Sequence, residues 1–154
     1  MFKGPHKLQP LARFGDSQGS IVLGWIAPQV LYVRMDGQCS DGLGATFANR
    51  LERAIWATSE FRVFIDLWQL DTYSFPARDR IVAVLKAHKK RFTSLEVLVR
   101  STIVSLGVRT GAIVLGSVVH VYTRPAQFMA LMQGRVPQVR ALLEPSISPR
   151  PELA

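Results

Sequence analysis

Two patterns of apolar residues alternate along the chain, and together they predict an α/β protein. Short apolar, β-branched runs bounded by turn residues are typical of strands, whereas apolar residues that recur every three or four positions are typical of helices. The five predicted strands are residues 20–26, 30–35, 61–67, 95–99 and 118–122. The four predicted helices lie within residues 41–55, 76–92, 103–115 and 125–134. The predicted order is therefore β-β-α-β-α-β-α-β-α.

This order predicts a mixed, mostly parallel five-stranded sheet. Strands that alternate with helices pair in parallel through right-handed crossovers. Only Ala27-Pro28-Gln29 separates the first two strands, so we expect a hairpin that gives the sheet one antiparallel edge strand. The almost continuously apolar strand at residues 61–67 is expected to be covered on both faces.

Local signals place the first two predicted helices. Asp41 can cap the first helix, and Pro76 lies near the start of the second. The second helix is expected to carry His88 and Phe92 on its apolar side. We also expect His120, which lies inside a predicted strand, to be packed in the core.

The third predicted helix, residues 103–115, is apolar nearly all round and should be well buried. Together with the strand after it, this helix forms the most apolar stretch of the chain. Arg109 and several glycines interrupt that stretch, which is too short for a membrane span. The fourth helix opens at Pro125 and is expected to end at Gly134.

The length of 154 residues fits one domain, which we place at residues 19–135. Residues 1–18 mix Gly, Pro, Lys, Arg and Gln without a period and are interpreted as a basic N-terminal arm. Residues 136–154 are expected to hold a short helical segment, at 138–143, and a proline-rich tail.

The composition excludes several classes of protein. A hydrophobic fraction of 48% with a net charge of only +8 excludes a disordered chain. The single cysteine, Cys39, excludes a disulfide scaffold, and the three histidines lie too far apart for a metal cluster, so neither a metal nor a cofactor is expected. Without a secretory signal, the cytoplasm is the expected compartment. A mean hydropathy of +0.16 is high for a soluble monomer and points to a homodimer or an apolar partner surface.

Three segments resemble the STAS domain, the family of anti-sigma factor antagonists. Residues 30–37 (Val-Leu-Tyr-Val-Arg-Met-Asp-Gly) look like the family's strand that ends in a turn glycine before the first helix. Residues 63–70 (Val-Phe-Ile-Asp-Leu-Trp-Gln-Leu) resemble its central strand, and residues 99–108 (Val-Arg-Ser-Thr-Ile-Val-Ser-Leu-Gly-Val) are similar to the strand that enters its third helix. The resemblance, which extends over about residues 30–132, implies a STAS-like fold and a bacterial regulatory module that binds a protein.

The loop after the central strand departs from the family's pattern. In the family, Asp-Leu is followed by Asp-Ser-Ser-Gly or a close variant, in which a serine or threonine is phosphorylated by a kinase-like anti-sigma factor. Aligned from Asp66-Leu67, this chain has Ser74 at the family's aspartate and Phe75 at its phosphoacceptor, and Pro76-Ala77 replaces Ser-Gly. Phenylalanine cannot accept a phosphate, so we expect the usual phospho-switch to be absent unless Ser74 replaces it.

This loop and the helix after it contain the candidate site residues. Ser74 is the candidate regulatory residue, because the amides and dipole of a helix N-terminus favour a phosphate. Alternatively, Ser74 simply caps the helix. Trp68, just past a strand end, is the tryptophan expected to be exposed at a binding surface. The candidate partner-binding residues are Trp68, Tyr73, Phe75, Arg78 and Arg80.

Residues 78–91 are strongly basic, with Asp79 as the lone acid. Such a helix fits an acidic protein surface, phosphates or a nucleic-acid backbone, and it also fits a merely solvated face. No aromatic residues interleave with the charges, and no nucleic-acid motif occurs. We therefore expect an acidic protein partner, and keep nucleic-acid or anion binding by helix 78–91 as the alternative.

Little in the sequence favours catalysis. Asp66 lies at the carboxyl end of a central parallel strand, where ligands of open α/β sheets bind, with Asp71 and Asp79 nearby in sequence. These aspartates would suggest a phosphoryl-transfer pocket only if they converged, and no Gly-rich phosphate loop, nucleophile elbow or HExxH motif occurs. The sequence thus predicts a non-enzymatic module that docks its central loop and basic helix onto a partner.

Overall fold

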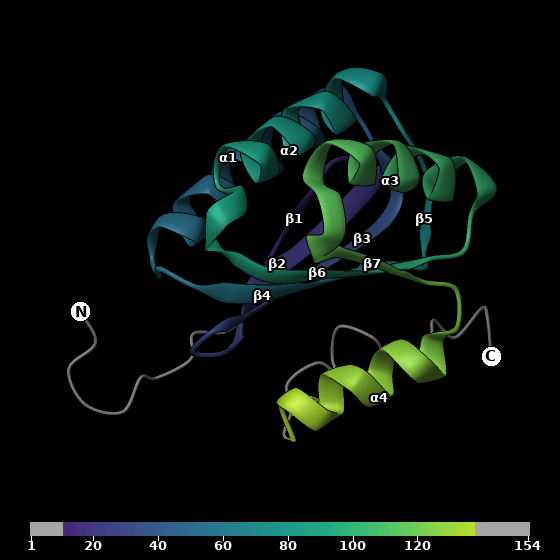
Figure 1. Cartoon of the computed structure of the whole chain (residues 1–154). Helices are drawn as coiled ribbons and strands as arrows, with labels where there is room; N and C mark the ends of the chain where they lie inside the picture. The colour runs from purple at the N-terminus through teal and green to yellow at the C-terminus, as the bar shows by residue number, and fades with distance from the viewer. Residues whose placement is uncertain (1–10, 138–154) are drawn as a thin grey trace.

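The computed structural model describes residues 11–137, which form seven strands and four α-helices (Figure 1). The strands are β1 (Ala12–Gly15), β2 (Gly19–Ala27), β3 (Val30–Cys39), β4 (Phe61–Leu67), β5 (Leu70–Tyr73), β6 (Phe92–Val99) and β7 (Val119–Tyr122). The helices are α1 (Asp41–Trp56), α2 (Phe75–Ala87), α3 (Thr102–Leu115) and α4 (Pro125–Arg135). Short 3₁₀ turns at Lys89–Arg91 and Gly116–Val118 lead into β6 and β7.

The strands form one mixed sheet in the order β1-β2-β3-β4-β6-β7, and β5 pairs with the end of β3. The β1–β2 and β2–β3 pairs are antiparallel. The β3–β4, β3–β5, β4–β6 and β6–β7 pairs are parallel. The predicted α/β class, the hairpin and the mostly parallel pairing are confirmed.

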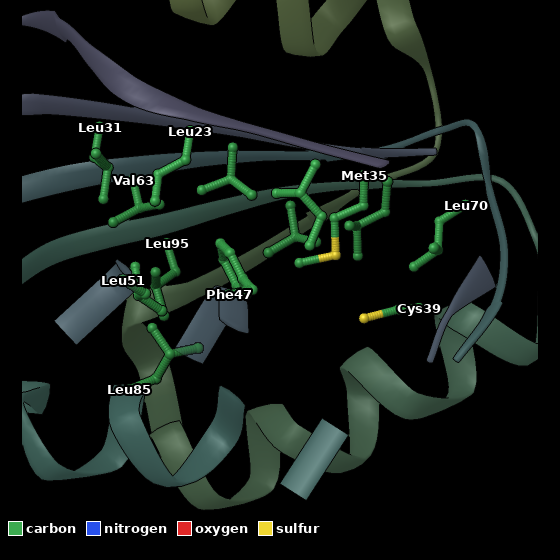
Figure 2. Close-up of a cluster of buried hydrophobic side chains, with 14 of the residues drawn as sticks. Leu23, Leu31, Met35, Cys39, Phe47, Leu51, Val63, Leu70, Leu85 and Leu95 are labelled. Carbon is green, nitrogen blue, oxygen red and sulfur yellow. The ribbon is translucent and has the colours of Figure 1, made fainter. Parts of the chain in front are cut away.

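Helices cover both faces of the sheet, with α1, α2 and α3 on one face and α4 on the other (Figure 1). Successive side chains of a strand point to opposite faces, so Leu31 and Val33 of β3 join the core under α1–α3 while Tyr32 joins the core under α4. The larger of these two clusters is shown in Figure 2. Apolar residues on both faces explain why the central strand has an almost continuous apolar sequence.

Two of the seven strands in residues 11–137 were not predicted. β1 lies in the segment expected to be an N-terminal arm, and it pairs with β2 through Ala12 and Leu23. Most of its residues are exposed, so it has no apolar pattern. β5 lies in the expected polar loop, where Leu70 is buried and Tyr73 pairs with Cys39. The prediction of five strands was therefore wrong, and β2 is not an edge strand.

Several predicted details of the helices were also wrong. Ser40 rather than Asp41 caps α1, because the Ser40 hydroxyl oxygen accepts a hydrogen bond from the Leu43 amide. α2 stops at Ala87, so His88 follows the helix and Phe92 opens β6 after a turn of three basic residues. Gly134 lies inside α4. The predicted helical segment at residues 138–143 is outside the described residues.

Contrary to prediction, α3 is buried along one narrow side only. Its buried residues are Val104, Gly107, Gly111 and Leu115. Four large apolar side chains are 43–84% exposed, namely Ile103, Leu106, Ile113 and Val114. Tyr73 lies against the inward side of this helix at Gly107, where an added Cβ would collide with its hydroxyl. No helix within residues 11–137 is long and apolar enough to cross a membrane.

Candidate functional site

The loop between β4 and α2 is fastened to the beginning of α3. The Asp66 carboxylate accepts a hydrogen bond from the Trp68 amide at 3.0 Å. Arg100 donates to the Trp68 carbonyl at 2.8 Å and to the Asp71 carboxylate at 3.2 Å. The Ser101 hydroxyl donates to the Asp71 carbonyl at 3.3 Å. These contacts fix the position of the loop relative to the sheet edge formed by the strand ends.

Ser74 caps α2. Its hydroxyl oxygen accepts a hydrogen bond from the Ala77 amide at 3.1 Å, and its own amide donates to the Cys39 carbonyl at 2.9 Å. The capping role that was the alternative interpretation of Ser74 is therefore present in the structure. That the protein works without a phosphate on Ser74 stays a prediction.

Tyr73, Phe75 and Arg78 lie together at the start of α2, and we call them the Phe75 cluster. Phe75 is 67% exposed, and the Arg78 guanidinium lies over its ring at 5.2 Å from the centroid. The Tyr73 ring is 6.4 Å from that of Phe75, centroid to centroid. The Tyr73 hydroxyl donates to the Ile103 carbonyl at 3.3 Å. The cluster thus connects the loop to the exposed first turn of α3.

Trp68 and Arg80 lie apart from this cluster. Trp68 is half-buried and packs against the core under α4, on the opposite side of the sheet. The expectation that Trp68 is the exposed tryptophan was therefore wrong, and Trp56 is 60% exposed instead. Arg80 is exposed, but residues two apart on a helix do not share a face, so it points away from Arg78. The structure brings together three of the five predicted partner-binding residues.

The basic segment 78–91 is not one continuous face. The Arg91 guanidinium stacks on Trp56 at 4.3 Å and donates to the carbonyls of Ile55 and Thr58 at the end of α1. Arg91 therefore satisfies carbonyl groups that the helix end leaves open. At the other end of the segment, Arg78 pairs with Asp79 at 3.2 Å. Part of the charge that suggested an anion-binding helix is used within the protein.

The three aspartates considered for phosphoryl transfer do not converge. Asp71 pairs with Arg100, and Asp79 pairs with Arg78. Asp66 is held by the Trp68 amide, and burial raises the pKa of its carboxyl group. Within residues 11–137, no three His, Cys, Asp or Glu side chains are placed to hold a metal ion.

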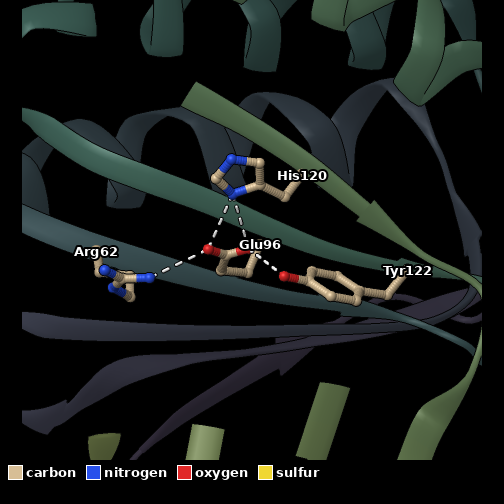
Figure 3. A network of polar contacts seen from close by, with 4 residues as sticks. All are labelled: Arg62, Glu96, His120 and Tyr122. Atoms are coloured by element: carbon tan, nitrogen blue, oxygen red, sulfur yellow. Dashed lines mark hydrogen bonds and ion pairs between the residues drawn. The ribbon is translucent and has the colours of Figure 1, made fainter. Parts of the chain in front are cut away.

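A polar network that was not predicted lies on the α4 side of the sheet (Figure 3). Glu96 of β6 is only 2% exposed, and its carboxylate pairs with Arg62 of β4 at 3.1 Å. The Nδ1 atom of His120 lies 3.1 Å from each carboxylate oxygen, and the Tyr122 hydroxyl donates to one of them at 3.0 Å. The expectation that His120 is a core histidine was wrong, because its side chain is 53% exposed.

This network neutralises a buried carboxylate. Burial raises the pKa of Tyr122, and the hydrogen bond to Glu96 raises it further. The phenol therefore stays protonated and acts as a donor. Glu96 faces His120 directly across the β6–β7 ladder, so strand register alone brings the pair together. The signal that could have revealed the network is a lone glutamate inside an otherwise apolar strand, because a buried charge needs partners.

The topology and the two-sided core define a STAS-like α/β fold, as the three resembling segments implied. A solved structure with this fold is the uncharacterized protein from the DUF3478 family with a SpoIIAA-like fold from Shewanella loihica PV-4. It aligns with a TM-score of 0.58 and 15% sequence identity, over 77% of this chain and 98% of that one. At this identity the likeness establishes the fold alone. Neither a protein-family model nor a curated protein matches the sequence.

Proposed function

We propose that this chain is a non-catalytic, STAS-like regulatory module that docks onto a bacterial signalling protein through the Phe75 cluster, without the family's phospho-switch. The observation that carries the proposal is an exposed phenylalanine at the position aligned with the family's phosphoacceptor. An aromatic ring with an arginine stacked on it is the kind of anchor that dominates binding energy at protein interfaces.

The apolar surface continues from this cluster onto α3. Tyr73 joins Phe75 to the first turn of α3, where Ile103 is 59% and Leu106 is 67% exposed. Soluble monomers seldom expose several large apolar side chains in one area, and such areas usually mark an interaction surface. A partner that covered Phe75 would therefore also bury part of α3.

Charge favours an acidic partner. The chain has a net charge of +8, and α3 contains no acidic residue. Complementary charge speeds association and selects among partners. We place this interaction in the cytoplasm, as expected for a chain with one buried cysteine and no disulfide. The nucleic-acid alternative gains no specific support, because Arg78 and Arg91 have partners within the fold.

Site-specific crosslinking in the native cells tests the proposal. The photoreactive residue p-benzoylphenylalanine would replace Phe75 in one variant and Trp56, an exposed aromatic side chain on the distant end of α1, in the control. We expect an adduct with one identified protein at position 75 and none with that protein at position 56. The same adduct at both positions would show that the Phe75 cluster is not the docking site.

Three substitutions separate docking from phosphorylation. Tyr73→Ala and Arg78→Ala should weaken binding to the crosslinked partner, because each removes a side chain of the cluster. Ser74→Ala should leave partner binding intact and cost only the helix cap, about 1 kcal/mol in the free energy of unfolding. Partner binding that depends on stoichiometric phosphate at Ser74 would contradict the mechanism.

A further inference from the structure

A cavity of about 120 Å³ lies between the sheet and helices α1, α2 and α3. Met35 and Cys39 line it from the sheet and Phe47 lines it from α1 (Figure 2). Close-packed protein interiors contain few voids larger than one water molecule. This cavity is several times that size, so it needs a structural explanation.

The inward side of α3 explains the cavity. Gly107 and Gly111 line it. Tyr73 occupies the space beside Gly107, whereas a Cβ at Gly111 would meet only the end of the Val82 side chain. The large residues of the same helix, such as Leu106 and Ile113, are turned to the surface. The absence of a side chain at Gly111 therefore leaves part of the volume open, at a cost in lost packing.

The lining of the cavity is almost entirely apolar. Of its few polar groups, the Tyr73 hydroxyl donates to the Ile103 carbonyl and the Arg78 guanidinium pairs with Asp79. Burial raises the pKa of the Cys39 thiol to about 11, so this group is uncharged at neutral pH. A buried polar group without a hydrogen-bond partner is costly, so an occupant of this cavity must be apolar.

The cavity reaches the surface between α2 and α3. Ile81 and Val82 of α2 and Val108 and Ala112 of α3 line it and are each partly exposed. A ligand would enter between these small and medium-sized apolar side chains.

We infer that this cavity is a binding site for a small, uncharged apolar ligand about the size of one aromatic ring. An apolar cavity of about 150 Å³ in another protein stays dry and binds benzene, and the present cavity is close to that size. Tyr73 and Arg78 of the Phe75 cluster also line the cavity, but Phe75 itself does not, so a change at Phe75 separates this inference from the docking surface.

Thermal unfolding of the full chain with benzene and phenol as probes tests this site. A ligand that binds only the folded state raises the melting temperature in a saturable way. We expect such a rise with benzene and a much smaller one with phenol, whose hydroxyl would lose its bonds to water in an almost entirely apolar lining. No saturable rise with benzene, or an equal rise with phenol, would overturn the inference.

Substitutions in the cavity wall locate the binding. Val97→Phe should fill much of the cavity and weaken benzene binding by roughly tenfold or more, and the milder Val97→Ile should weaken it less. Val22→Ile adds the same methylene group to the core on the α4 side and should leave benzene binding unchanged. Equal weakening by Val97→Ile and Val22→Ile would contradict the location. Phe75→Ser should leave benzene binding intact while removing partner docking, so that the two proposals can fail separately.

Discussion

At the scale of single residues, Glu96 is the side chain whose environment most clearly requires partners. Glu96→Gln keeps the shape but removes the charge that pairs with Arg62, His120 and Tyr122. We expect a loss of about 2 kcal/mol in the free energy of unfolding, within the range for hydrogen bonds to charged groups. The Arg62 side chain is 19% exposed and can be partly hydrated, which keeps the loss below that of a fully buried pair. Urea unfolding of both proteins at pH 7 measures this loss in the free energy of unfolding.

An exposed ion pair provides the control for this prediction. Asp79→Asn removes a carboxylate that is 69% exposed and pairs with Arg78 on the surface of α2. Surface pairs contribute little, so we expect a change within about 0.5 kcal/mol. If the two substitutions destabilised the protein equally, burial of Glu96 would not be the cause of its effect.

Asp66 makes stability depend on pH in the opposite sense from a salt-bridged carboxylate. Burial raises the pKa of Asp66 in the folded state, so the folded protein takes up its proton at a higher pH than the unfolded chain does. The contribution of this group is therefore present below the unfolded pKa, about 4, and is lost as the pH rises through the folded pKa. Asp66→Asn carries no charge and still accepts from the Trp68 amide. Its stability relative to the natural protein should increase from pH 4 to pH 7 in urea unfolding, and a constant difference would contradict the prediction.

The sequence predicts the placement of candidate site residues where the information is local. The register of Ser74 and Phe75 at the start of a helix follows from the sequence, and Tyr73 and Arg78 lie within four residues of them. The predicted exposure of Trp68 was wrong. Which face of the sheet a residue at a strand end joins depends here on where β5 pairs, and the sequence pattern did not reveal that pairing. The Glu96 network needs three strands in register, so no local pattern contains it.

At the scale of elements, the apolar pattern predicted five of the seven strands in residues 11–137 and missed two short ones. β3, β4 and β6 are buried at most positions and β2 at four of nine, and all four were predicted, as was the half-buried apolar strand β7. β1 and β5 are four residues long and mostly exposed or half-buried, so backbone pairing rather than burial defines them. The orientation of α3 was not predictable either, because an element that is apolar on all sides does not indicate which side faces the core.

The orientation of α3 can be tested at Gly107. A glycine-to-alanine change inside a helix normally stabilises it by up to about 1 kcal/mol. At Gly107 we expect the opposite, a loss of about 1–3 kcal/mol, because the added Cβ would collide with the Tyr73 hydroxyl. Chemical denaturation followed by circular dichroism would measure the change. The loss should shrink but not vanish when Tyr73→Phe removes that hydroxyl, because the ring carbon that carries it also lies too close to the added Cβ.

Gly42 serves as the matched control for this prediction. It lies in the first turn of α1, and a Cβ placed there would meet nothing within 4 Å. We therefore expect Gly42→Ala to be neutral or stabilising. A stabilising Gly107→Ala would mean that α3 does not lie against Tyr73.

At the scale of the whole molecule, the positive charge is less available than the composition implies. Arg34 forms a two-point contact with Asp36, and Arg62 is paired with Glu96. Arg91 is used at the end of α1, and Arg100 fastens the loop through Asp71. Part of the positive charge is thus held in contacts within the fold, and the composition alone could not show this.

This distribution predicts how the chain behaves toward nucleic acid. Binding through phosphates releases condensed counterions, so a true nucleic-acid protein gains affinity from a continuous basic surface and loses it steeply as salt rises. The basic segment here is interrupted by the end of α2 at Ala87 and by the stacking of Arg91 on Trp56. We therefore expect no binding tighter than about 10⁻⁶ M at physiological salt, in the non-specific range, as measured by gel shift with DNA and RNA of unrelated sequences.

Arg80→Ala, which removes an exposed cation without a role in the Phe75 cluster, should reduce this weak binding equally for all sequences. A tight, sequence-selective shift would make nucleic acid, and not an acidic protein, the partner of this surface.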